Sequence, residues 1–188
     1  MKIERAAWPK TVGDVPVCNL VFVDESAAST SMTRLYGRSP VGERVTDSTP
    51  LSGWRSFTML SAIRFDGPFA PLLLDGPMDG NSFTAWLEQM LIPALRPGDV
   101  VVLDNLSTHR VSTVLRLLEK SGHGLLYLPP YSPDLNPIEE MWSKVKSVLR
   151  SLKARTWDEL LSAMATALES ITKNDCDGYF KHCGHRIN

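Results

Sequence analysis

The chain has 188 residues, 43% hydrophobic and 22% charged, and its 20 Lys and Arg nearly balance its 21 Asp and Glu. This length fits one domain with a proper core. The apolar fraction is too high for disorder and too interrupted for a membrane span. Three cysteines are too few for a disulfide scaffold, and the absence of an apolar leader makes the cytosol the default compartment. A net charge of −1 argues at first against a nucleic-acid binder, which usually carries a basic excess.

The first half of the chain predicts three strands. An apolar, Val-rich run over 15–23 ends in Asp24 and is typical of a buried strand. Residues 26–53 are dense in Ser, Thr, Gly and Pro and predict a long irregular segment, with at most a short strand at 34–36. The runs 56–65 and 69–74 flank Asp66-Gly67, a hairpin signal, and predict an antiparallel pair.

The second half alternates helices and strands. In chain order, we expect a helix over 81–95, a strand over 100–103, a helix over 111–118, a strand over 125–128, and two final helices that begin at Asn136-Pro137 and at Thr156. A hairpin followed by βα units predicts a mixed sheet with helices on its faces.

Two apolar strands each end in an aspartate, Asp24 and Asp104. Sheets of this kind place their functional groups at the carboxyl ends of strands. Carboxylates on neighbouring strands can share a hard divalent cation, and a third carboxylate would hold a second ion about 3.5–4 Å away. Taken singly, each aspartate is also a common turn or cap residue.

The third carboxylate has two candidates, Glu139 and Glu140. Glu140 precedes Lys144 by one helical turn, so we expect a solvated surface pair there. Glu139 lies in the first turn of its helix beside the apolar stripe, where it could either bind a metal or complete the cap with Asn136. The helical pattern alone leaves both roles open.

A twelve-residue run favours the metal-binding role of Glu139 over the capping role. Residues 128–139 read Leu-Pro-Pro-Tyr-Ser-Pro-Asp-Leu-Asn-Pro-Ile-Glu, and Trp142 and Lys144 follow. With Val-Asp-Glu-Ser at 23–26, Val-Leu-Asp-Asn at 102–105, and 34 residues between Asp104 and Glu139, this run resembles the signature of the DDE transposases. More narrowly, it is similar to the mariner-like superfamily and its bacterial insertion-sequence branch, over roughly residues 17 to 184.

The resemblance implies a fold, a site and an activity. The implied fold is α/β and ribonuclease H-like, with a mixed five-stranded sheet in the order 3-2-1-4-5. The implied catalytic and metal-binding residues are Asp24, Asp104 and Glu139, holding two ions of Mg²⁺ or Mn²⁺. The implied reaction is metal-dependent cleavage of DNA at the ends of a mobile element, followed by strand transfer into target DNA, typically at a TA step.

Further residues follow from the same resemblance and from the charge pattern. Asn105 and His109 would lie near the scissile strand, although His109 could equally cap a helix. Lys144, Lys146 and Arg150 belong to an acid-free run over 142–155, and Arg34 and Arg38 belong to a second basic segment that also includes Arg44, Arg55 and Arg64. Such runs are usually solvated faces, but beside a nucleic-acid site they would contact the DNA backbone.

The expected organisation is an N-terminal extension over 1–16 and a catalytic domain over 17–188, with no helix-turn-helix module. The expected partners are DNA, a homodimer mate and a separate DNA-binding protein, with no membrane. The expected location is the bacterial cytoplasm, in association with the nucleoid. The alternative is an inactive transposase remnant. A phosphatase with an Asp nucleophile is disfavoured, because position 26 is Ser where such enzymes repeat the Asp.

Overall fold

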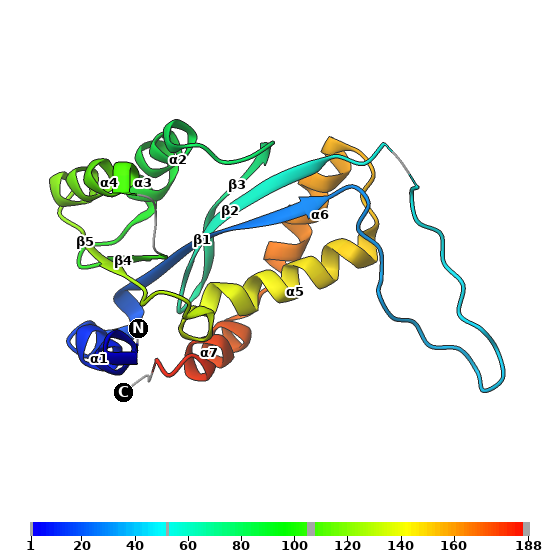
Figure 1. Ribbon diagram of the computed structural model, residues 1–188, viewed down its shortest axis with the longest axis horizontal. Coiled ribbons are helices and arrows are strands. Elements are labelled where there is room, and N and C mark those ends of the chain that lie inside the picture. The colour runs from blue at the N-terminus through cyan, green and yellow to red at the C-terminus, as the bar shows by residue number, and fades with distance from the viewer. Residues whose placement is uncertain (1, 52, 105–107, 186–188) are drawn as a thin grey trace.

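The computed structural model describes residues 2–51, 53–104 and 108–185, without the side chains of residues 2–4 and 108–111. Its centre is a five-stranded sheet in the order β3-β2-β1-β4-β5 (Figure 1). The strands are β1 (Leu20–Ser29), β2 (Ser56–Arg64), β3 (Gly67–Asp75), β4 (Val100–Leu103) and β5 (Gly124–Tyr127). β1, β2 and β3 pair antiparallel, whereas β1, β4 and β5 pair parallel. The predicted strand order and the hairpin are confirmed.

Helices cover both faces of the sheet. One face carries α1 (Lys2–Gly13), α5 (Pro137–Leu152), α6 (Trp157–Glu169) and α7 (Lys173–His182). The other carries α4 (Thr108–Lys120) and a helix that runs from α2 (Gly80–Trp86) through a π-helical turn (Leu87–Leu91) into α3 (Ile92–Ala94). Short 3₁₀ turns at Val17–Asn19 and Pro133–Leu135 precede β1 and α5.

The alternation of side chains along each strand divides the interior into two cores. In β1, Leu20 and Phe22 pack against α5, while Val21 and Val23 pack on the opposite face of the sheet. Both sets are almost fully buried, which explains why the segment reads as a continuous apolar run rather than an alternating one.

Three elements differ from the sequence-based expectation. β1 does not end at Asp24 but continues to Ser29, because its second half pairs with β2. No strand forms at 34–36. A third C-terminal helix, α7, follows α6. Its capping box, formed by Thr172 and Asp175, is a sequence pattern that predicts a helix start at this point.

The N-terminal segment is a helix docked on the domain. In α1, the Trp8 side chain is 4% exposed and belongs to the core that contains Phe22. At the other extreme, residues 31–51, which we call the arm, project from the body and are almost entirely exposed beyond residue 33 (Figure 1). Arg155 holds the base of the arm by donating to the carbonyls of Thr30 and Met32. Among the described helices, none is both long enough and apolar enough to cross a bilayer.

Candidate active site

The strand register places Asp24 and Asp104 side by side. The parallel pairing of β1 with β4 ends at Val23 and Leu103, so the two aspartates are the next residue on each strand. Side-chain alternation then fixes their direction: Asp24 follows Phe22, and Asp104 follows Val102, on the face covered by α5. The two aspartates therefore lie together even though β1 continues past Asp24, because β4 ends just before Asp104.

Glu139 reaches the same region from α5. The loop after β5 leads through a 3₁₀ turn into α5, where the buried side chains of Ile138 and Met141 anchor the first turn in the core. Glu139 is exposed beside them. It lines a cavity of about 360 Å³ together with Asp104, and the loop between β5 and α5 supplies the remaining walls: Leu128, Pro129, Pro130, Tyr131, Ser132, Pro133 and Asn136.

Glu139 does not complete a capping box with Asn136 at the start of α5. Asn136 stands at the N-cap of α5 without a side-chain capping bond, and its backbone N–H donates to the Pro133 carbonyl. The N–H that a capping glutamate would accept from is therefore already used. The Glu139 carboxylate is left facing the cavity.

The three carboxylates influence one another electrostatically. The pKa of Asp24 rises from 3.8 to about 7, first because the group is buried, then because of the negative charge of Glu139 and, more weakly, that of Asp104. A backbone hydrogen bond from Glu25 opposes the rise. A carboxyl group held in this way is typical of a functional site, since the fold gains nothing from the repulsion.

The donor set fits a hard divalent cation. Carboxylate oxygens are the ligands that Mg²⁺ and Mn²⁺ take, and a cation among them would offset the repulsion that, after burial, raises the pKa of Asp24. Within the described residues, no three His, Cys, Asp or Glu side chains are already gathered at coordinating distance.

Glu140 and Lys144 do not form the surface pair that their spacing predicted. Glu140 lies 3.6 Å from His182 of α7, and Lys144 donates to Asp175 at 2.7 Å and to the Ser170 carbonyl at 2.9 Å. Lys144 thus ties α5 to α7, which makes it a poorer candidate for a DNA contact than its sequence neighbours.

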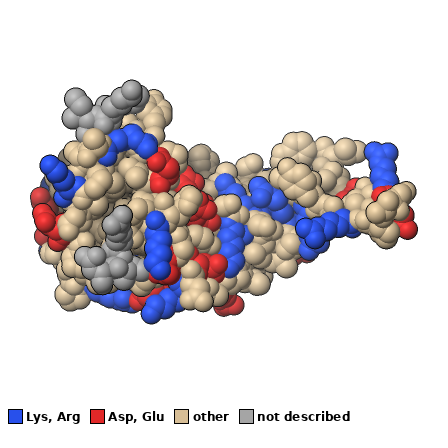
Figure 2. Space-filling view, turned by 90° about the horizontal axis from the view of Figure 1, so that it is seen from below, with Lys and Arg blue, Asp and Glu red and all other residues tan. Residues whose placement is uncertain are grey.

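The other basic residues considered for DNA contact differ in how exposed they are. Arg34 and Arg38 are exposed on the arm, and Lys146 and Arg150 are partly exposed on α5. In Figure 2, Lys and Arg side chains extend from the middle of the molecule onto the arm. Arg64 is the exception, because its side chain is 4% exposed and paired with Asp99 in the interior, where no phosphate can reach it.

Two secondary candidates cannot be placed. Asn105 lies outside the described residues, and the side chain of His109, in α4, does so as well. What sequence reasoning missed is the set of contacts that hold the loop before Glu139. They involve Arg5 and His185, which come from opposite ends of the chain, and no local pattern announces them.

The comparisons with known proteins agree with this geometry. A family model described as DDE superfamily endonuclease matches residues 19–161. The transposase of the transposable element Tcb1 from Caenorhabditis briggsae is 30% identical over 100 residues, which cover 51% of this chain and 37% of that relative. The chain thus matches well under half of the length of this relative.

Two solved structures show the same fold. A pre-cleavage Mos1 transpososome matches with a TM-score of 0.77 at 14% identity, over 98% of this chain and 58% of that chain. The catalytic domain of Mos1 transposase with raltegravir and Mn matches with a TM-score of 0.68 at 12% identity, over 99% and 88% of the two chains. The expected ribonuclease H-like fold is thereby confirmed.

Proposed function

Because the chain belongs to the DDE superfamily endonuclease family, we propose that it is the catalytic domain of a mariner-like transposase, of the bacterial insertion-sequence branch. It cuts DNA strands at the ends of a mobile element and joins them to target DNA. The observation that supports the proposal is the cavity that Asp104 and Glu139 share, together with the effect of both charges on the pKa of Asp24.

Each carboxylate has a distinct place in this reaction. Asp24, Asp104 and Glu139 would hold two Mg²⁺ or Mn²⁺ ions, with Asp24, whose pKa responds to both other charges, contributing to both ions and the other two to one each. Such ions, when bound, activate the attacking oxygen and stabilise the leaving oxygen of a phosphodiester. The chain contributes position: two carboxylates fixed to paired strands and one to a helix anchored in the core.

An Asp104→Asn variant should fold normally and lose metal-dependent strand cleavage. Asp104 is exposed at the end of β4, so the amide replaces the carboxylate without disturbing the core. Removing one metal ligand from a site of this kind lowers the rate by roughly a thousandfold or more. Circular dichroism establishes the fold, and nicking of an end-labelled duplex in Mn²⁺ measures the activity. Retained cleavage by the folded variant would falsify the assignment of Asp104.

The DNA backbone is proposed to run along α5 and the arm. Replacing Lys146 and Arg150 by glutamine should reduce the salt dependence of duplex binding, with a log–log slope smaller by about 2, because each lost phosphate contact contributes about 0.9. Arg116→Gln with Lys120→Gln, also one turn apart but on α4 across the sheet, is the matched control. A slope that changes equally in both double variants removes α5 from the interface.

The partners of the proposed reaction are DNA, a second copy of the chain and a separate protein that reads the element ends. One assay addresses them: a DNA end and Mn²⁺ are supplied to the chain alone and to the chain with such a DNA-binding protein. Nicking in either mixture supports the enzyme. No nicking in both favours the alternative of an inactive remnant.

A further inference from the structure

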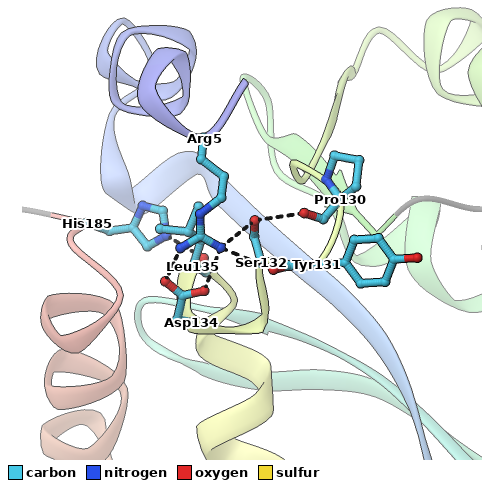
Figure 3. A network of polar contacts seen from close by, with 7 residues as sticks. All are labelled: Arg5, Pro130, Tyr131, Ser132, Asp134, Leu135 and His185. Carbon is cyan, nitrogen blue, oxygen red and sulfur yellow. Dashed lines mark hydrogen bonds and ion pairs between the residues drawn. The ribbon is translucent and has the colours of Figure 1, made fainter. Parts of the chain in front are cut away.

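The loop that carries Glu139 into the site is braced from both ends of the chain (Figure 3). Arg5, in α1, lies against one side of the turn at residues 131–134, and His185, beyond α7, contacts the carbonyl that follows it. Arg5 also lies outside residues 19–161, the segment that the family model matches.

Arg5 makes four hydrogen bonds to this turn. Its guanidinium donates to the Tyr131 carbonyl at 3.1 Å, to the Ser132 hydroxyl at 2.9 Å, and to the two carboxylate oxygens of Asp134 at 3.0 and 2.6 Å. The hydrogen bond from Arg5 also lowers the pKa of Asp134. One planar side chain thus fixes three residues of the turn at once, which a flexible lysine could not do.

The turn needs this support because its backbone is strained. Tyr131 has a φ of 55°, in the left-handed region that residues with a Cβ rarely adopt. Its side chain is 87% exposed, and in Figure 3 the ring points away from the Arg5 guanidinium. The ring is thus mostly free of packing, and the Arg5 guanidinium donates to the backbone carbonyl of this residue.

The far end of the turn is tied to the strand that carries Asp24. His185 is 4% exposed, and its Nε2 atom lies 3.0 Å from the Leu135 carbonyl. Its ring packs against Phe22, with 4.9 Å between the centroids, and Phe22 precedes Asp24 by two residues on the same face of β1. The turn is therefore held at one end by Arg5 of α1 and at the other by His185, which packs against β1.

The braced turn leads directly into Glu139, the glutamate of the proposed metal site. Asn136 lies just after the turn, and its backbone carbonyl accepts a hydrogen bond from the backbone N–H of Glu139 at 3.2 Å. The same turn lines the cavity that Asp104 and Glu139 share. A shift of the turn would therefore move Glu139 relative to the two aspartates.

We propose that Arg5 is a positioning residue that sets the turn at 131–134 and, through it, the carboxylate of Glu139 for divalent-metal binding. The inference rests on the proposed metal site. It assigns to α1 a role in the reaction, not merely in the fold. The side chains of Arg5 and Asp134 are 37% and 58% exposed, and pairs so exposed contribute little to stability, so the contribution of Arg5 is to geometry.

The test is the affinity of the full chain for Mn²⁺, measured by titration calorimetry, together with the melting temperature. We expect Arg5→Ala to weaken Mn²⁺ binding by about tenfold or more, as the loss of a group that orients a metal ligand does. The melting temperature should change by less than about 3 °C. Arg5→Lys should give an intermediate affinity, and Lys10→Ala, on the same helix, should bind Mn²⁺ like the wild type.

A double-mutant cycle localises the effect. Asp134→Ala should weaken Mn²⁺ binding as Arg5→Ala does, and the double variant should be no worse than either single one. Unchanged Mn²⁺ affinity in Arg5→Ala overturns the inference. So does a fall in melting temperature of more than about 8 °C, because α1 would then serve the fold.

The readout separates this inference from the proposed function. A wild-type chain that binds Mn²⁺ but cuts no DNA, either alone or with the separate DNA-binding protein, refutes the proposed function alone. A wild-type chain that cuts DNA, with Mn²⁺ affinity unaffected by Arg5→Ala, refutes the positioning role alone. A wild-type chain that binds no Mn²⁺ overturns both.

Discussion

An Asp24→Asn chain is expected to cut no DNA and yet to be more stable than the wild type at pH 8 without metal. The carboxylate of Asp24 is half-buried, and this desolvation, with the charges of Glu139 and Asp104, raises its pKa from 3.8 to about 7. Between about pH 4 and pH 7 the folded protein keeps a proton that the unfolded chain has released. Wild-type stability therefore falls as the pH rises through this window and stays low above it.

Asparagine removes the ionisation and with it the loss of stability. We expect the two chains to have similar free energies of unfolding near pH 4, and the variant to be more stable by roughly 2 kcal/mol at pH 8. Urea unfolding at the two pH values measures the difference, and adding Mn²⁺ should stabilise the wild type only. Asp14→Asn is the control, since Asp14 is exposed and does not act on the pKa of Asp24. A variant less stable than the wild type at pH 8 would contradict the electrostatic account.

Arg64→Ala is expected to cause a large loss of stability, because Arg64 belongs to a buried ion pair. The Arg64 guanidinium donates to Asp99 at 2.5 Å, and the two side chains are 4% and 0% exposed. Arg64 also donates to the Ala94 carbonyl and lies 4.3 Å from the centroid of the Phe69 ring. Removing it leaves the Asp99 carboxylate buried without its counterion, which costs about 3–5 kcal/mol.

Most of this loss of stability comes from leaving the buried Asp99 charge unpaired, and less from the lost contacts of Arg64. Asp99→Asn added to Arg64→Met should therefore recover much of the stability, because the amide can still accept from the Arg96 N–H that Asp99 now binds. Urea unfolding of the single and double variants measures the recovery. A loss below about 1 kcal/mol in Arg64→Ala would mean that water reaches the pair.

The sheet was predictable because its signals are local. The apolar runs of β4 and β5 and the hairpin between β2 and β3 have the lengths and turn residues that their structures require. Asp104 was found from the same signal, since it directly follows β4. Glu139 needed the signature run, because its place in the helix fitted a cap equally well.

The errors arose where pairing over long distances decides the outcome. β1 continues past Asp24 because residues 24–29 pair with 56–61, and no property of the Ser- and Ala-rich sequence announces that partner. Likewise, Lys144 prefers Asp175, 31 residues away, to Glu140 one turn away. Arg64 appeared to belong to a basic surface segment, but Asp99 holds it in the interior.

The net charge does not show how the charges are distributed. The balance of 20 basic and 21 acidic residues suggested no affinity for DNA. In the structure, Asp104 and Glu139 line one cavity and their charges act on Asp24, and other acids neutralise basic residues within the fold, as Asp99 and Asp175 do. The arm and the exposed side of α5 keep basic side chains available to a partner.

The most direct test of the three-carboxylate site compares two adjacent residues of α5. Glu139 lines the cavity and raises the pKa of Asp24, whereas Glu140 lies near His182 on α7. The measurement is Mn²⁺-dependent nicking of a DNA duplex by Glu139→Gln and by Glu140→Gln, side by side. We expect Glu139→Gln to lose cleavage by roughly a thousandfold and Glu140→Gln to keep it. Equal activity in the two variants, or loss in Glu140→Gln alone, would contradict the account.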